Sequence, residues 1–116
     1  MDEFDQGQTT IAPDVLLTIA RLTTLKVDGV SRLSPVAAGV NRLFRRGYGE
    51  GVRIEIDEDM VYADIYVILC NDVNIRDVSR TIQRNVGRAI SEMIGMQIGR
   101  INIHIEDIDY PENAET

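Results

Sequence analysis

The side chains best suited to chemistry gather around the single histidine of the chain, His104. It stands in a run of alternating polar and apolar residues, which predicts Asp64 and Glu106 on the same face of a sheet. A histidine beside carboxylates could bind a metal ion or exchange protons with a substrate. Such sites need convergent ligands and a cavity, and flat strands supply neither. We therefore predict no metal site, no catalytic site and no cofactor here.

Two tyrosines are predicted on the same outward face as His104. Tyr62 and Tyr66 flank Asp64 along one strand. Neighbouring strands should add further polar residues to this face: Arg53, Glu55, Asn102, His104 and Glu106. An open sheet face with aromatic rings is typical of a surface that binds a second copy or another protein. We predict that Tyr62, Asp64, Tyr66 and His104 contact a partner.

Arginines and aromatic residues also cluster in the middle of the chain, at Arg42, Phe44, Arg45, Arg46 and Tyr48. Guanidinium groups bind the phosphates of lipids or RNA, while an aromatic ring inserts or stacks. The alternative is a solvated loop whose arginines meet the many carboxylates of an acidic chain. This basic loop is a candidate contact for a partner.

Glycines at positions 47, 49 and 51 follow in the same loop. A phosphate-binding glycine loop comes after a strand and opens a helix, so that helix N–H groups meet the phosphate. Here the glycines lead into a strand, and no Lys-Ser/Thr pair follows. The segment is therefore interpreted as a connection and not as a nucleotide site.

Four arginines recur at every fourth position further along the chain: Arg76, Arg80, Arg84 and Arg88. On a helix they form a slowly winding stripe roughly opposite the apolar face. Asp72, Asp77 and Glu92 stand at helical spacing from them, which predicts partial neutralisation by intrahelical ion pairs. A solvated face is one interpretation of this arginine stripe, and an acidic protein partner is the other.

Composition narrows the class of protein. The net charge of −7 argues against a general nucleic-acid-binding surface, which is normally basic. The single cysteine, Cys70, cannot form an internal disulfide, as fits a reducing cytosol. The acidic start is unlike a signal peptide, and no apolar run approaches the roughly 20 residues that cross a bilayer. We expect a cytoplasmic protein without a transmembrane segment, which reaches the cytoplasmic membrane only through a surface patch or a partner.

The longest regular stretch must position most of these side chains. Alternate positions from Val61 to Leu69 are apolar, which predicts a strand over Met60 to Cys70 with one buried face. Asn74 then offers a helix N-cap, apolar residues recur at steps of three and four, and Gly95 supplies the stop. A strand that feeds a helix is the start of a crossover unit.

The other elements are predicted from shorter patterns. Pro13 fits the first turn of a helix over about 14–27, whose apolar face contains Val15, Leu16, Ile19, Ala20 and Leu22. Alternation predicts a strand over 52–56, a hairpin turn at 57–59 and a last strand over 100–106. Gln8 to Ile11 is a possible short edge strand, and 36–44 suggests a short helix.

These elements predict an α+β fold of two layers. The hairpin pair must be antiparallel, and the last strand should run parallel to the Met60 strand because a helix connects them. We expect a small mixed sheet of three to four strands with two main helices on one face. Residues 8–108 form the single domain, between acidic tails at 1–7 and 109–116.

Several segments, in this order and spacing, resemble the alkaline shock protein family: Ile11-Ala12-Pro13-Asp14-Val15, Asp28-Gly29-Val30, Val61-Tyr62-Ala63-Asp64-Ile65, Val73-Asn74-Ile75, Ile82-Gln83-Arg84-Asn85-Val86 and Ile101-Asn102-Ile103-His104-Ile105. The resemblance spans about residues 7 to 108. One departure is Lys26, where family members commonly carry a glutamate.

The resemblance implies a non-enzymatic, cytoplasmic bacterial protein of the envelope stress response. Some members self-associate and are held at the cytoplasmic membrane by a membrane-anchored partner, and others are linked to acetyl-CoA carboxylase. The family offers no catalytic residues to carry over. Our first hypothesis is a homo-oligomeric scaffold that acts through protein partners. The alternatives are a regulator that binds acetyl-CoA carboxylase, or a weak binder of RNA or anionic lipid through the basic loop.

Overall fold

The stretch from Met60 to Gly95 forms the centre of the fold, in a computed structural model that describes residues 7–35, 48–49 and 51–110. Strand β4 is Met60–Cys70 and helix α3 is Ile75–Ile94. Asn74 is the N-cap of α3, because its side-chain oxygen accepts a hydrogen bond from the backbone N–H of Asp77 at 3.0 Å. Gly95 ends the helix at a φ of 83°, which costs glycine little because it has no β-carbon. The prediction for this stretch is confirmed.

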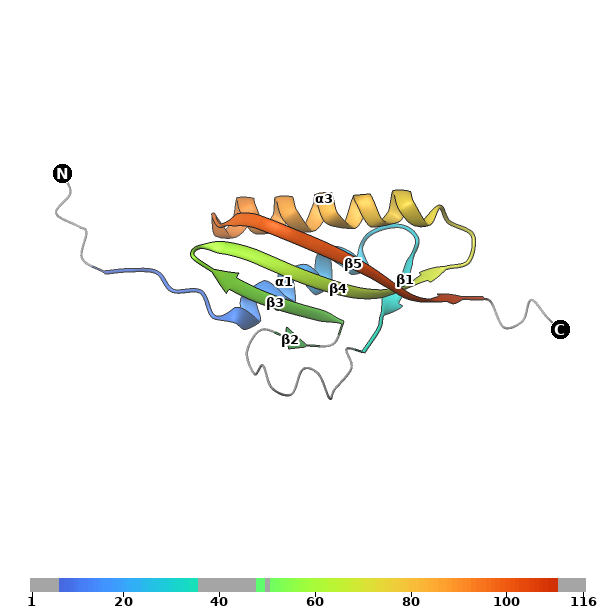
Figure 1. Ribbon diagram of the computed structural model, residues 1–116, viewed down its shortest axis with the longest axis horizontal. Coiled ribbons are helices and arrows are strands. Elements are labelled where there is room, and N and C mark those ends of the chain that lie inside the picture. The colour runs from blue at the N-terminus through green and yellow to red at the C-terminus, as the bar shows by residue number, and fades with distance from the viewer. Residues whose placement is uncertain (1–6, 36–47, 50, 111–116) are drawn as a thin grey trace.

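Strand β4 has neighbours along both edges (Figure 1). Strand β3 (Val52–Asp57) pairs with its first half and β1 (Val30–Leu33) with its last part, both antiparallel. Strand β5 (Gln97–Asp109) pairs with β4 in parallel, from Met60 to Cys70. The two-residue β2 (Tyr48–Gly49) extends the sheet beyond β3. The sheet is therefore mixed, and the parallel pairing of β4 and β5 is as predicted.

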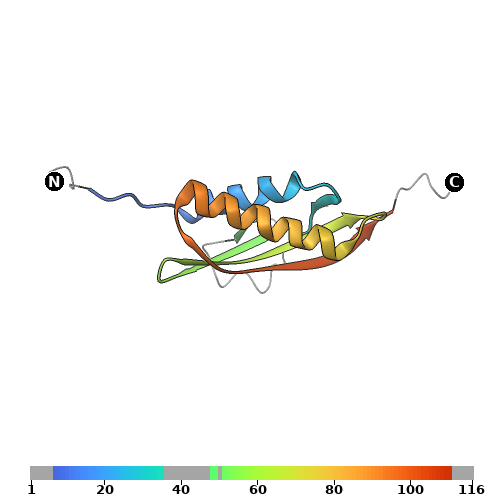
Figure 2. The same ribbon diagram turned by 90° about the horizontal axis from the view of Figure 1, so that it is seen from above.

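Both helices lie on one side of the sheet, α3 beside α1 (Pro13–Leu25), as Figure 2 shows. This arrangement confirms the two-layer α+β class. Among the described residues the sheet has five strands, where three to four were expected. The difference comes from β1 and β2, which are four and two residues long and too short to show a period of two.

An aliphatic core fills the space between the layers. The five alternate β4 residues that were predicted to be buried are 0–1% exposed: Val61, Ala63, Ile65, Val67 and Leu69. Helix α3 meets them with Val78, Ile82, Val86 and Ile90. The opposite face of β4 carries Tyr62, Asp64 and Tyr66, which are half-buried. One face of the sheet is thus committed to the core, and the helices leave the other uncovered.

Three expectations need correction or fall outside the structure. Residues Gln8 to Ile11 form no strand, because they have no sheet partner among the described residues. Helix α1 buries Leu16, Leu17, Ala20 and Thr24, so its core-facing side is rotated away from the predicted face. Val15 and Leu22 are exposed as a result. The short helix suggested within 36–44 lies outside the described residues.

Candidate interaction surface on the open sheet face

The carboxylate of Asp64 joins three strands on the open face of the sheet. Its Oδ1 lies 2.9 Å from Nε2 of His104 and accepts a hydrogen bond from Nδ2 of Asn102 at 3.1 Å. Its Oδ2 accepts a bond from Nη2 of Arg53 at 3.4 Å. Arg53 comes from β3, Asp64 from β4, and Asn102 and His104 from β5. The predicted gathering of these side chains on one face is confirmed, and we call this set the Asp64 network.

The network lowers the pKa of Asp64. Partial burial by itself raises that pKa, because burial disfavours the charged carboxylate. The hydrogen bonds from His104 and Asn102 and the positive charges of Arg53 and His104 outweigh burial, so the pKa of Asp64 lies below 3.8. Asp64 is therefore ionised at neutral pH and works as an acceptor.

Aromatic rings lie on both sides of this network. The rings of Tyr66 and His104 stack, with centroids 4.5 Å apart and planes 13° from parallel. Tyr62 lies over the backbone of Gly99, where an added β-carbon would come 2.5 Å from the tyrosine ring. The guanidinium of Arg100 lies 5.8 Å from the centre of the same ring. Together these contacts fix the rings of Tyr62 and Tyr66 against the sheet.

Gly99 is a position that the sequence reasoning missed. It is a glycine inside an otherwise alternating strand, a pattern that often marks a bulge or a close approach. The pairing of β4 with β5 shifts here, because Val61 is opposite Ile98 but Tyr62 is opposite Arg100. The signal was present in the sequence, although the identity of the ring above Gly99 was not.

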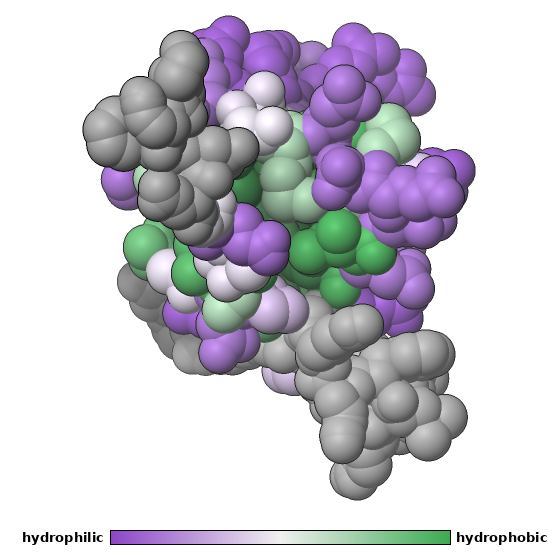
Figure 3. Space-filling model, turned by 90° about the vertical axis from the view of Figure 1, so that its left-hand side faces the viewer, coloured by the Kyte–Doolittle hydropathy of each residue, from purple (hydrophilic) through white to green (hydrophobic). Residues whose placement is uncertain are grey.

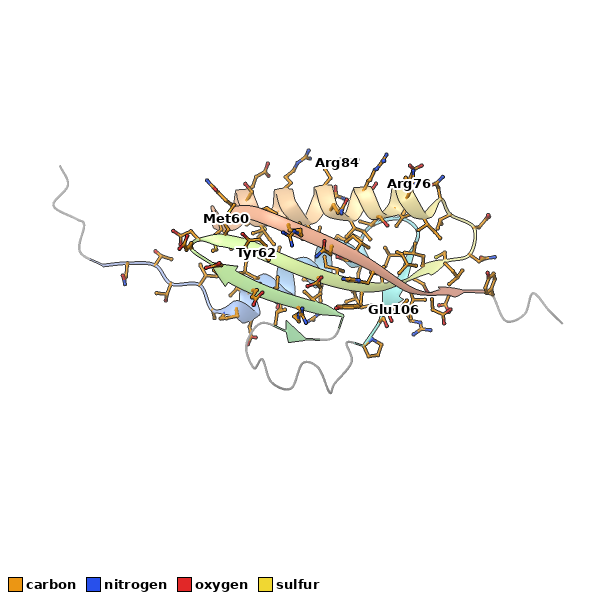
Figure 4. All side chains as sticks on the ribbon, in the orientation of Figure 1. Met60, Tyr62, Arg76, Arg84 and Glu106 are labelled. Carbon is orange, nitrogen blue, oxygen red and sulfur yellow. The ribbon has the colours of Figure 1, made fainter. Side chains whose placement is uncertain are left out.

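The ionisable side chains of the open face differ in exposure and in position. The Asp64 and His104 side chains are 23% and 39% exposed. Glu106 lies towards the C-terminal end of β5, well away from the Met60 end of β4 (Figure 4), after a second shift in the pairing. No group of three or more His, Cys, Asp or Glu residues in the described part of the chain could hold a metal ion.

The arginine stripe lies on the exposed side of α3. Figure 4 shows Arg76 and Arg84 pointing away from the sheet, and Arg80 and Arg88 are exposed as well. The predicted ion pairs with Asp72, Asp77 and Glu92 are wrong. No nitrogen of the stripe comes within 4.0 Å of a carboxylate that the structure describes. Exposed side chains gain little from such pairs, and here their four charges stay available.

Most of the predicted basic loop is not among the residues that the structure describes. Arg42, Phe44, Arg45 and Arg46 lie outside the described residues. The backbone of Tyr48 pairs with that of Arg53 as part of β2. A role of this loop in contact with a partner stays a prediction.

Two other surface features accompany the open face. A shallow groove between the end of α1 and the first half of α3 is lined by residues that include Lys26, Asp28 and Asp77. At the end of the molecule seen in Figure 3, hydrophobic residues gather between hydrophilic ones. Among the exposed apolar residues are Ile56 of β3 and Met93 of α3, the latter 69% exposed.

Comparison with known proteins assigns the chain to a protein family. The model of the alkaline shock protein 23 family, described as having a cell envelope-related function, matches residues 1–110. The chain belongs to this family. The uncharacterized protein YqhY of Bacillus subtilis (strain 168) is 32% identical to this chain over 111 residues. The match covers 94% of this chain and 82% of YqhY. Spy1535 of Streptococcus pyogenes serotype M6, also uncharacterized, is 37% identical over 105 residues, covering 88% and 79%.

The fold of this chain is also similar to solved structures of proteins other than these relatives. The MamM CTD in its copper form superposes with a TM-score of 0.55 at 10% identity, covering 81% of this chain and 84% of that one. The MamM CTD C267S variant gives 0.52 at 12% identity, covering 81% and 94%. This likeness shows the fold alone. Neither α1 nor α3 combines the length and the apolar character that crossing a membrane requires.

Proposed function

We propose that this chain is a non-enzymatic interaction protein of the cell envelope, and that a second copy binds to the open face of its sheet. One observation carries the proposal, namely that the side chains of the Asp64 network are held in place on a face that the helices leave uncovered. The family's cell envelope-related function supports the cellular setting.

The chemistry of the open face suits association better than catalysis. The stacked Tyr66 and His104 rings and the Tyr62 ring over Gly99 offer rigid aromatic area. Rigid rings lose little conformational entropy on binding, and tyrosine is enriched in interfaces. The Asp64 network satisfies its own polar atoms, which lowers the cost of covering them. Work at the cytoplasmic membrane would then require a membrane-anchored protein partner.

Sedimentation velocity over about 1 to 100 µM protein, a range that covers weak homodimers, tests this proposal. We expect a monomer–dimer equilibrium within that range. Tyr62→Ala combined with Tyr66→Ala should raise the dissociation constant by about tenfold or more, since aromatic anchors dominate such interfaces. Leu22→Ala combined with Met93→Ala removes apolar side chains that are exposed on the helices, and serves as the matched control.

The two double variants must first show the circular dichroism of the wild type. A wild type that stays monomeric at the highest concentration would contradict the proposal. So would equal weakening by the two pairs, because association would then not depend on the sheet face.

A further inference from the structure

The outer edge of β5 has no strand beside it. Among the described strands, β5 pairs only with β4. At 13 residues it is also the longest strand of the sheet that the structure describes. An unpaired edge presents a row of backbone N–H and C=O groups that another chain can bond.

Within the described part of the chain, side chains bond to the β5 edge at two points. Gln83 of α3 donates from its Nε2 to the carbonyl oxygen of Ile101 at 2.9 Å. The carboxylate of Asp107 accepts the N–H of the next residue, Ile108, at 2.8 Å. We call the part of β5 between these points, Asn102 to Glu106, the open edge.

The open edge offers the backbone groups of two isoleucines. Because the carbonyl of Ile101 points away from β4, alternation directs the N–H and C=O groups of Ile103 and Ile105 the same way. No described residue bonds to these groups from that side. Ile103 and Ile105 can therefore pair with an incoming extended chain.

Helix α3 runs beside this edge in the direction opposite to β5. Gln83 bonds to Ile101, and Gly87, later in α3, lies near Ile101 and also near Ile98, which comes earlier in β5. Arg80 and Arg76 precede Gln83 by about 4.5 and 10.5 Å along the helix axis. Ile103 and Ile105 follow Ile101 by about 7 and 13 Å along the strand. The two arginines are thus level with the open edge.

The four arginines turn gradually away from the open edge, by about 40° from each one to the next along the helix. At about 100° per residue, Arg76 and Arg80 project within about 20° and 60° of Gln83, which reaches the β5 edge. Arg84 and Arg88 are turned about 100° and 140° away. Arg76 and Arg80 therefore lie nearer to the open edge than Arg84 and Arg88 do.

We propose that the open edge of β5 binds an acidic, extended peptide segment of another protein as an added strand. Its backbone pairs with Ile103 and Ile105, the mode known as β-augmentation. Carboxylates at its positions i and i+2 meet Arg80 and Arg76. The spacing fits, since alternate residues of a strand are about 6.7 Å apart and residues four apart on a helix about 6 Å.

A second copy of this chain suits the edge less well. Antiparallel pairing of β5 with its own copy would place both α3 helices on the same face of the joined sheet. Arg76 and Arg80 of one copy would then approach the same residues of the other, and like charges repel. The charge of the stripe thus selects an acidic segment. This inference uses the sheet edge and α3, and does not depend on association through the open face.

The probe for the test is an acetylated and amidated peptide of alternating valine and glutamate, Val-Glu-Val-Glu-Val-Glu-Val, with a fluorescent label. We expect it to bind the full chain in fluorescence anisotropy. Arg76→Glu combined with Arg80→Glu should weaken binding by about tenfold or more, as for charge pairs at interfaces. Arg84→Glu combined with Arg88→Glu makes the same change of charge on the same helix, and should stay within about threefold of the wild type.

Two further readouts separate strand addition from simple charge attraction. Bound peptide should slow hydrogen exchange at the amides of Ile103 and Ile105, because they become hydrogen-bonded. A peptide N-methylated at every residue keeps its charge but lacks N–H donors on both edges, and should not slow that exchange.

Several results would overturn the inference. These are no binding to the wild type, equal weakening by the two arginine pairs, or exchange that slows elsewhere but not at Ile103 and Ile105. Protection of those amides that rises with protein concentration without peptide would assign the edge to a second copy instead. Failure of dimerisation in sedimentation leaves these measurements unaffected, so the two proposals fail separately.

Discussion

At the scale of single residues, Asp64 determines how the open face is organised. One carboxylate accepts hydrogen bonds from residues of both neighbouring strands, β3 and β5. Half-buried charged groups are stable only when they are paired. The network therefore holds the face in one arrangement, and its loss should appear in the dependence of stability on pH.

Replacing Asp64 with Asn should flatten that dependence in acid. Because the pKa of Asp64 is lowered in the folded state, its contribution is complete above the ordinary value of 3.8. The contribution is lost as pH falls through the lower folded value. Urea unfolding at about pH 7 and about pH 3 should show a smaller loss for Asp64→Asn than for the wild type. At neutral pH the variant should be less stable by about 1–3 kcal/mol.

Asp72→Asn is the matched control for this change. Asp72 is exposed in the turn before α3 and joins no ion pair in the part of the chain that the structure describes. Its removal should leave the loss of stability in acid as large as in the wild type. If Asp64→Asn behaves in the same way, the network does not stabilise the ionised carboxylate.

At the scale of elements, α3 depends on the cap at its N-terminus. The side chain of Asn74 satisfies the N–H of Asp77, which has no partner within the helix. Asn74→Ala should lower the free energy of unfolding by about 1 kcal/mol, the usual value for such a cap. Urea denaturation followed by circular dichroism measures it. Asn71→Ala, in the same turn but outside the cap, should change stability by less than about 0.5 kcal/mol.

The sequence allowed prediction of those elements whose patterns are long. β4 and α3 repeat their apolar spacing over 11 and 20 residues, so both the bounds and the buried faces were predictable. β1 has four residues and is held in the sheet by its pairing with Val67 to Leu69, a contact 34 or more residues away that no local pattern reveals. The face of α1 was misplaced because apolar residues surround much of that helix, and only the packing decides which of them are buried.

The sequence predicts which residues lie on the open face but not how they are arranged there. A period of two assigns Asp64, Tyr66, Asn102 and His104 to one side. It does not set the register of β5 against β4, which shifts at Gly99 and again near Glu106. That register decides that His104 stacks on Tyr66 and that Glu106 falls at the second shift, four residues beyond Asn102, which is opposite Asp64.

At the scale of the whole molecule, one core joins both layers. Side chains from both helices and from β1, β3, β4 and β5 belong to a single buried cluster. Neither layer can then lose its packing while the other keeps its own. Tyr62 and Tyr66 alternate along β4 with residues buried against the helices, so their side chains lie on the far side of the sheet. They therefore report on a region that the helical signal of circular dichroism does not.

We therefore expect the two signals to change together. Tyrosine fluorescence and the helical circular dichroism should give the same urea midpoint, as for a two-state domain. Ile82→Ala removes a fully buried side chain from α3 and should lower the free energy of unfolding by about 2–5 kcal/mol in both signals. Ile75→Ala, on the same helix but 46% exposed, should cost less than about 1 kcal/mol. Separate midpoints in the wild type, or a shift of the helical signal alone in Ile82→Ala, would mean that the sheet folds without α3 and that its open face does not require the helices.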